Sequence, residues 1–212
     1  MPSESVNKLE NMNWKKISIL LLVLLIADQA LKIWVKTSMH LDETIMIIPD
    51  WFRLHFVENN GAAFGMQLSL GSRFDWGKLL LSLFRIGLVG AMFFYIRHLI
   101  REKAPKGVII GITMIVAGAI GNIIDSAFYG LIFSASTPAT IAEFGGSYAP
   151  FMMGRVVDMF YFPLFQWNNC PSWLHFLLDS NNYFFGAIFN LADAYISVAV
   201  VYLILFHHRF FK

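Results

Sequence analysis

The sequence predicts an all-α integral membrane protein with four transmembrane helices. Of its 212 residues, 57% are hydrophobic and only 14% are charged, whereas a soluble domain usually carries about 25% charged residues. Four separate apolar runs also approach the roughly 20 residues that cross a bilayer core. The net charge of +2 is too small to indicate a nucleic-acid partner. The single cysteine, Cys170, excludes an internal disulfide and a cysteine-based metal cluster.

We expect one membrane domain over residues 1–212, with spans at about residues 17–36, 78–97, 107–125 and 183–206. The third span is rich in glycine and other small residues, which is typical of helices that pack closely in lipid. The first span resembles a secretory signal peptide because Lys15 and Lys16 precede it. It continues to Val35 without a small-residue cleavage site, so we expect an uncleaved helix.

Basic residues predict the orientation of these spans, because the cytoplasmic loops of membrane proteins carry an excess of Lys and Arg. They collect before the first span, between the second and third, and after the fourth: Lys15, Lys16, Arg97, Arg101, Lys103, Lys106, Arg209 and Lys212. Both termini are therefore expected in the cytoplasm, and segments 37–77 and 126–182 outside. Within the first of these segments, the alternation over Thr44–Phe56 predicts a short β-element on the membrane surface.

The carboxylates within or next to the apolar spans, with the amide and lysine residues spaced beside them, fall near the outer ends of the helices, where they could form one site. They are Asp28, Lys32, Asn122, Asp125, Asn190 and Asp193. A charged side chain inside a bilayer is costly unless it is paired, so an intramembrane acid indicates a function by default.

The spacing of these residues predicts shared helix faces. Asp28 and Lys32 are four residues apart with the acid first, which favours an ion pair on one face. In Asn122–Asp125 and Asn190–Asp193, an amide lies three residues before an acid, so we expect each amide to stand beside its own acid and hold its rotamer. The alternative role of these amides is helix capping and hydrogen bonding between helices.

A further acid, Asp158, ends the G-R-V-V-D stretch of the second outside segment. If Asp158 and Asp193 meet, they would share a proton, because two neighbouring carboxyl groups cannot both ionise cheaply. This is the arrangement of an aspartic hydrolase. The stretch N-N-G-A-A-F at Asn59–Phe64 predicts a tight turn on the same side. There, Asn59 could bind an extended substrate strand and Phe64 could anchor the loop in lipid, although on these six residues alone an ordinary hairpin turn is the simpler interpretation.

Motifs of other chemistries do not occur in the sequence. It contains no H-E-x-x-H, no G-x-S-x-G and no glycine-rich nucleotide loop, so we expect neither a metal nor another cofactor. Two other classes of function are a proton-coupled carrier that uses the acids as a relay, and a membrane scaffold with structural acids. A carrier pathway needs polar residues on both sides of the midplane, whereas the inner halves of these spans are nearly all hydrocarbon.

Five ordered blocks give the chain a resemblance to a known family. They are D-Q-A-x-K at Asp28–Lys32, N-x-G-A-A-F at Asn59–Phe64, G-A-I-G-N-x-x-D at Gly118–Asp125, V-V-D at Val156–Asp158 and F-N-L-A-D at Phe189–Asp193. Together they resemble the lipoprotein signal peptidases, the type II signal peptidases of bacterial inner membranes. The resemblance spans nearly the whole chain.

The resemblance implies four transmembrane helices with a small periplasmic β-cradle. It implies cleavage of the signal peptide just before the diacylglyceryl-cysteine of prolipoproteins, with Asp158 and Asp193 as the catalytic dyad. The residues that would support the substrate or the site are Asn59, Gly61, Asn122, Asp125, Asn190, Asp28 and Lys32. It also implies a bacterial inner (cytoplasmic) membrane location, an active site that faces the periplasm, prolipoproteins and membrane lipids as partners, and inhibition by globomycin-type peptides. We expect a monomer.

Two features depart from the family pattern. Ser126 stands where the family usually has an arginine directly after the third-block aspartate, so Asp125 would lack its local ion pair. Arg155 is the candidate replacement for that arginine. In addition, residues 126–154 form a longer connection than usual, which we interpret as an inserted external loop.

Overall fold

The computed structural model describes residues 12–60, 76–178 and 182–211. Within them, four helices are long and apolar enough to cross a membrane, which confirms the predicted fold class. They are α1 (Trp14–Ser38), α2 (Trp76–Arg101), α3 (Lys106–Ile124) and α5 (Leu191–His207). Helix α3 continues through a π-helical turn (Asp125–Tyr129) into the short α4 (Gly130–Ile132), so the third apolar span runs over Lys106–Ile132.

The predicted start of the fourth span at residue 183 is wrong. Residues 183–189 contain two short strands, β5 (Tyr183–Phe184) and β6 (Ile188–Phe189), and α5 begins only at Leu191. The physical reason is a capping box. The Asn190 side chain accepts from the backbone N–H of Asp193, and the Asp193 carboxylate accepts from the backbone N–H of Asn190.

The other ends of the spans also differ from the predicted bounds. Helix α1 starts at Trp14, because the side chain of Asn13 accepts a hydrogen bond from the Lys16 backbone N–H. The third span passes residue 125 and ends at Ile132, so the first turns of the expected external loop are helical.

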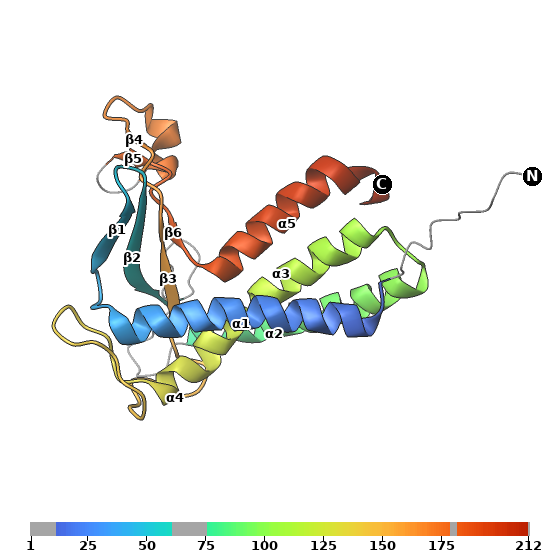
Figure 1. Cartoon of the computed structure of the whole chain (residues 1–212), viewed down its shortest axis with the longest axis horizontal. Helices are drawn as coiled ribbons and strands as arrows, with labels where there is room; N and C mark the ends of the chain where they lie inside the picture. Colours follow the sequence, from blue (N-terminus) through green and yellow to red (C-terminus); the bar gives the residue numbers. More distant parts are fainter. Residues whose placement is uncertain (1–11, 61–75, 179–181, 212) are drawn as a thin grey trace, which may run out of the picture.

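A small antiparallel sheet confirms the predicted β-element. Its strands β1 (Thr44–Ile48), β2 (Phe52–Asn59), β3 (Val156–Tyr161) and β6 lie in the order β1-β2-β3-β6. The sheet stands at the end of the bundle opposite the start of α1 and the end of α5, and its strands run across the helix direction (Figure 1). A second pair, β4 (Phe165–Gln166) with β5, extends beyond it.

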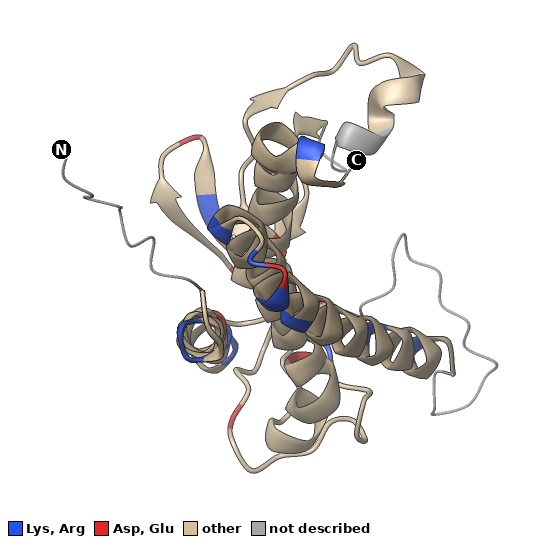
Figure 2. Ribbon diagram, turned by 90° about the vertical axis from the view of Figure 1, so that its right-hand side faces the viewer, with Lys and Arg blue, Asp and Glu red and all other residues tan. Residues whose placement is uncertain are grey.

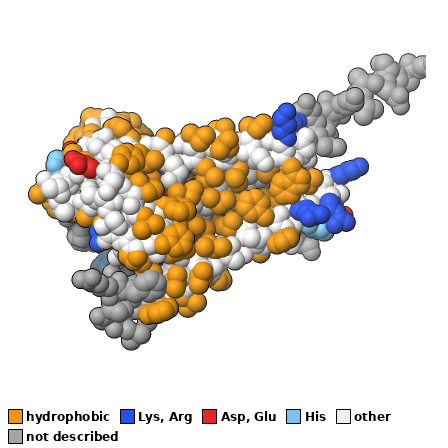
Figure 3. Space-filling view, turned by 90° about the horizontal axis from the view of Figure 1, so that it is seen from below, with side chains coloured by type: hydrophobic (Ala, Val, Ile, Leu, Met, Phe, Trp, Pro, Cys, Tyr) orange, Lys and Arg blue, Asp and Glu red, His pale blue; other side chains and the backbone are white. Residues whose placement is uncertain are grey.

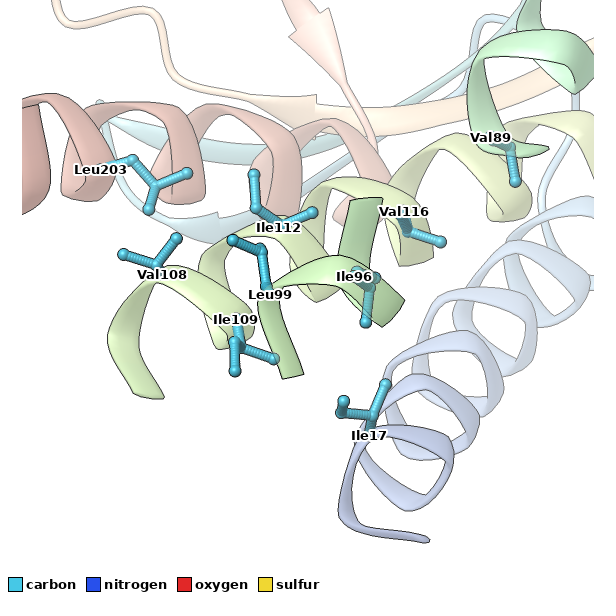
Figure 4. Close-up of a cluster of buried hydrophobic side chains, with 9 residues drawn as sticks. All are labelled: Ile17, Val89, Ile96, Leu99, Val108, Ile109, Ile112, Val116 and Leu203. Atoms are coloured by element: carbon cyan, nitrogen blue, oxygen red, sulfur yellow. The ribbon is translucent and has the colours of Figure 1, made fainter. Parts of the chain in front are cut away.

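Helix α3 lies at the centre of the bundle, as its small residues predict. It packs against α1, α2 and α5. A Cβ atom built on Gly111 would lie 2.8 Å from the Leu203 side chain of α5, so the glycine permits this close approach. The buried cluster at this level is drawn in Figure 4 and consists of Ile17, Val89, Ile96, Leu99, Val108, Ile109, Ile112, Val116 and Leu203.

The long segment after α4 packs onto the sheet. A second buried cluster joins the outer end of α1 to β2 and β3, and it includes Phe133 and Ala142 of this segment. Ser136 of the same segment is buried and accepts a hydrogen bond from Lys36 of α1 at 2.9 Å. This part of the expected external loop is therefore tied to the bundle.

Charged and apolar side chains divide the surface along the bundle. One face is a continuous hydrophobic belt, and Lys and Arg gather at the end opposite the sheet (Figure 3). Seen from that end, basic residues occupy the helix ends that face the viewer (Figure 2). The distribution is that of a multi-pass membrane protein with basic residues on one side.

Candidate active site

The first acid of the candidate site, Asp193, is fixed by local helix geometry. It occupies the third position of α5, where its backbone N–H donates to Asn190 Oδ1 at 3.0 Å. Its Oδ1 accepts a hydrogen bond from Asn122 Nδ2 at 2.8 Å. The capping box thus sets the backbone of Asp193, and an amide from α3 sets the carboxylate.

The second acid, Asp158, lies in the third position of β3 and is only 3% exposed. Asn190 Nδ2 donates to its Oδ1 at 2.6 Å. Asn59 Nδ2, from the end of β2, donates to its Oδ2 at 3.3 Å. Asn190 therefore caps the helix that carries Asp193 with its carbonyl oxygen and holds Asp158 with its amide nitrogen.

The two amide–acid pairs run between elements, which corrects the sequence-based expectation. Asn122 holds Asp193 instead of its own neighbour Asp125, and the Asn190 amide nitrogen holds Asp158. Asn190 Nδ2 also lies 3.1 Å from Asn122 Oδ1. The acids of β3 and α5 are consequently linked through two asparagines, one in the cap of α5 and one in α3.

The electrostatic environment of Asp158 favours its protonated form. Burial raises the pKa of this carboxyl from 3.8 to about 7, and the negative charge of Asp193 adds to the effect. The hydrogen bonds from Asn190 and Asn59 act in the opposite direction. A carboxyl group that holds a proton near neutral pH can act as a general acid.

A buried ion network supports the asparagines. Lys32 Nζ lies 3.1 Å from Asp28 Oδ2, 2.8 Å from Asp125 Oδ2 and 2.8 Å from Asn122 Oδ1. Three acceptors thus match the three donors of the ammonium group. Because Lys32 occupies the Asn122 oxygen, the nitrogen of that amide must point to Asp193. The predicted Asp28–Lys32 ion pair is present. Lys32 is connected to Asp193 through the side chain of Asn122.

The same network fixes the backbone of the elements that carry the acids. Asp28 Oδ1 accepts from the backbone N–H of Ala192 in the first turn of α5 at 3.0 Å. Asp125 Oδ2 accepts from the backbone N–H of Val157 in β3 at 3.3 Å. Each of these supporting acids therefore positions the chain beside one member of the dyad.

The proposed role of Arg155 as the ion-pair partner of Asp125 is wrong. Lys32 pairs with Asp125, while Arg155 Nη1 lies 3.1 Å from Glu58 Oε2. The Arg155 side chain is 41% exposed and the Glu58 side chain only 1%. Ser126, at the position of the family arginine, donates a hydrogen bond from its hydroxyl group to the backbone carbonyl oxygen of Asn122 at 3.0 Å.

Several residues of the site region were missed by the sequence reasoning. Gln29 Nε2 lies 2.9 Å from Asp125 Oδ1, and Tyr129 donates to Gln29 Oε1 at 3.1 Å. Lys36 pairs with Glu58 in a second buried ion pair. Gln29 lies inside the D-Q-A-x-K block, and Lys36 lies one turn after Lys32, so both carried a signal in their spacing. Gly61 and Phe64 lie outside the described residues.

No metal centre is evident in the described part of the chain. There, no group of three or more His, Cys, Asp or Glu side chains is arranged to hold a metal ion. The candidate site thus consists of two acids, three amides and the buried ion network behind them. Such an arrangement can activate water between a carboxylate and a carboxylic acid.

Known proteins match this chain over most of its length. The family model "Signal peptidase (SPase) II" matches residues 20–209. The lipoprotein signal peptidase of Porphyromonas gingivalis is 43% identical over 198 residues, which are 92% of this chain and 84% of that protein. The lipoprotein signal peptidase of Amoebophilus asiaticus is 34% identical over 91% of this chain and 77% of its own length.

Solved structures share the fold. Two, each described as a bacterial membrane enzyme, give TM-scores of 0.61 and 0.60 at 20% and 19% identity. Both matches cover 92% of this chain, with 88% and 94% of the other chains. At this level of identity they support the fold alone. The family match and the relatives extend over most of the sequence, and the chain therefore belongs to the signal peptidase II family.

Proposed function

We propose that this chain removes signal peptides from diacylglyceryl-modified prolipoproteins, with Asp158 and Asp193 as the catalytic dyad. The observation that supports this dyad is the position of Asn190. Its amide contacts Asp158 at 2.6 Å, while its carbonyl oxygen caps the helix at Asp193. One short side chain therefore joins two acids that are 35 positions apart in the sequence.

In the proposed reaction, one carboxylate takes a proton from a water molecule while the water oxygen attacks the scissile carbonyl carbon. The other carboxyl group gives its proton to the carbonyl oxygen, and a tetrahedral intermediate forms. The carbon–nitrogen bond then breaks, and the lipidated cysteine leaves as a free amine that receives a proton from the dyad. No covalent enzyme intermediate is needed. Asn59, Asn122 and Asn190 keep the two carboxyl groups in place.

The proposed setting is the bacterial inner membrane. Basic residues gather at the end of the bundle where α1 begins and α5 ends, which supports cytoplasmic termini and a periplasmic site. The acids lie at the opposite end, beside the sheet. A substrate could keep its acyl chains in the outer leaflet while its scissile bond reaches the dyad. We further propose that the enzyme acts as a monomer and is inhibited by globomycin-type peptides.

The carrier alternative is not supported, because the matched family and the similar relatives are peptidases. The dyad is tested with a purified diacylglyceryl-prolipoprotein, by following release of the signal peptide as a mobility shift. Asp158→Asn and Asp193→Asn should each abolish cleavage. The matched control is Asp50→Asn, an exposed turn residue at φ 71 where asparagine is tolerated equally well.

The control variant should process the substrate at the wild-type rate, and a globomycin-type peptide should block that activity. Substantial turnover by either dyad variant would refute the assignment of the catalytic residues. Failure of wild-type protein to cleave any lipidated precursor would refute the proposed reaction itself.

A further inference from the structure

Arg85 is a charged residue in the third turn of the membrane-spanning helix α2, and no sequence block includes it. The side chain is half-buried. A cation within a membrane span costs free energy, and such residues usually face the interior of a bundle and serve a function. Its surroundings therefore indicate what it acts on.

The face of α2 that carries Arg85 is the face that packs into the bundle. Ser82 and Val89, which lie three residues before and four residues after it, are both buried. Leu83, two residues before Arg85 and therefore on the opposite side of the helix, is 54% exposed. Because residues three and four apart share a helix face, Arg85 belongs to the buried seam.

The register of α2 against α3 places Arg85 at the level of the dyad. The two helices form an antiparallel hairpin, with α2 ending at Arg101 and α3 beginning at Lys106. Near this link, Leu99 and Ile96 of α2 share one buried cluster with Ile109, Ile112 and Val116 of α3 (Figure 4).

Equal rise along both helices brings together residues at equal distances from the link. Arg85 lies sixteen residues before Arg101, and Asn122 lies sixteen residues after Lys106. Asn122 is the residue whose amide holds the carboxylate of Asp193 at 2.8 Å. A second observation does not depend on this register: the negative charge of Asp193 interacts electrostatically with Arg85.

We propose that Arg85 is a positioning residue that keeps the negative charge of the dyad on Asp193 and the proton on Asp158. The proposal rests on the proposed dyad and assigns the roles within it. Among the described residues, the charged groups that act on Asp193 or on its hydrogen-bond partners are Arg85, Asp158 from β3, and the network of Lys32 and Asp28 from α1 with Asp125 at the end of α3. Lys32 is bound directly to the two supporting acids and also acts weakly on Asp158.

With this assignment, each proton in the reaction has a defined path. Asp193 takes a proton from the water as the oxygen–carbon bond forms, and Asp158 gives its proton to the carbonyl oxygen. Asp193 then gives its proton to the nitrogen as the carbon–nitrogen bond breaks. Asp158 regains a proton from a hydroxyl of the intermediate, which yields the carboxylic acid and restores both groups.

The first experiment measures the pH profile of kcat/KM for lipidated-precursor cleavage by Arg85→Gln, Arg85→Lys and Arg97→Gln. Without the guanidinium, the lower limb of the profile should move up by about one pH unit. Arg85→Lys keeps the charge and should follow the wild-type profile. Arg97→Gln removes an exposed cation from the inner end of the same helix and should also leave the profile unchanged.

A fall in kcat/KM for Arg85→Gln with an unchanged profile, or an equal shift for Arg85→Lys, would overturn the inference. If Asp158→Asn and Asp193→Asn are inactive in the same series, the proposed catalytic dyad is still supported. The role of Arg85 and the identity of the dyad can therefore be refuted separately.

A second experiment locates the proton without changing Arg85. Infrared difference spectra at neutral pH should show a protonated-carboxyl band that Asp158→Asn removes and Asp193→Asn retains. The opposite pattern would place the proton on Asp193 and refute the proposal even if the Arg85→Gln variant does not fold.

Discussion

Within the described residues, Lys32 is the one cation that contacts both buried supporting acids, and its replacement by methionine is the sharpest test of the network. The side chain is 0% exposed, and its ammonium group lies 3.1 Å from Asp28 and 2.8 Å from Asp125. Methionine has a similar length and no charge. In Lys32→Met, both carboxylates would therefore stay buried without the ammonium group, and the Asn122 oxygen would lose one of its two donors.

The expected loss of stability follows from these contacts. Removing one partner of a buried ion pair typically costs 3–5 kcal/mol, because a charge remains buried without compensation. Here one ammonium group serves two acids, so we expect at least about 3 kcal/mol. Reversible unfolding in mixed micelles measures this free energy. Lys15→Met, which removes an exposed cation from the same helix, should cost less than about 0.5 kcal/mol.

A charge-matched double variant separates the ion network from simple packing. Lys32→Met with Asp125→Asn carries the same net charge in the network as the wild type and leaves a single carboxylate, Asp28. It should recover part of the stability that Lys32→Met loses. A cost below about 1 kcal/mol for Lys32→Met, or a double variant less stable than the single one, would refute the account of Lys32 as the electrostatic centre of the site.

Three further predictions concern the dyad and the helix contacts. The raised pKa of Asp158 stabilises the fold fully below pH 3.8, and this contribution is lost as the pH rises through about 7. Unfolding curves should therefore show that Asp158→Asn is more stable than the wild type at pH 8 but not at pH 4. A difference in stability that does not depend on pH would contradict this. A Cβ atom on Gly121 would lie 2.6 Å from Asp28 Oδ2, whereas a Cβ atom on Gly87 would have no atom within 4 Å. Gly121→Ala should therefore cost about 1–3 kcal/mol of unfolding free energy, and Gly87→Ala should cost none. Equal costs for the two variants would exclude the close contact as the cause. Asn190→Ser should keep the helix cap but lose the amide group that donates to Asp158. We therefore expect a large fall in kcat/KM with little loss of unfolding free energy. A variant with the kcat/KM of the wild type would show that this donor is dispensable.

Much of the fold could be predicted because a helix that is buried in a bilayer requires a long apolar run in the sequence. The positions of α1, α2 and α3 follow from such runs, and the alternation over Thr44–Phe56 predicts β1 and β2. The start of α5 could not be read from hydrophobicity, because the strands β5 and β6 are as apolar as a helix. The spacing of Asn190 and Asp193 fits both a shared helix face and a helix cap, and the sequence alone does not choose between them.

The residues of the candidate site could also be found from the sequence, since acids and amides in membrane segments stand out. Their partners could not. Helical spacing predicted Asn122 beside Asp125, and the absence of the family arginine after Asp125 suggested Arg155 as the partner of Asp125. The structure instead pairs Asn122 with Asp193 and gives Asp125 to Lys32. A role for Arg85 could not be predicted, because a single arginine in an apolar helix belongs to no recognisable motif.

The sequence by itself determined that this chain spans a membrane and carries its reactive groups at one depth, because the cost of burying charge leaves few places for them. Only the tertiary structure decided which donor meets which acid. A side chain near a helix end can reach its own helix, a neighbouring helix or a strand at similar cost. The choice among them depends on the packing of α1, α3, α5 and β3 together, and that packing is set by close contacts at positions such as Gly121 that spacing along one helix does not reveal.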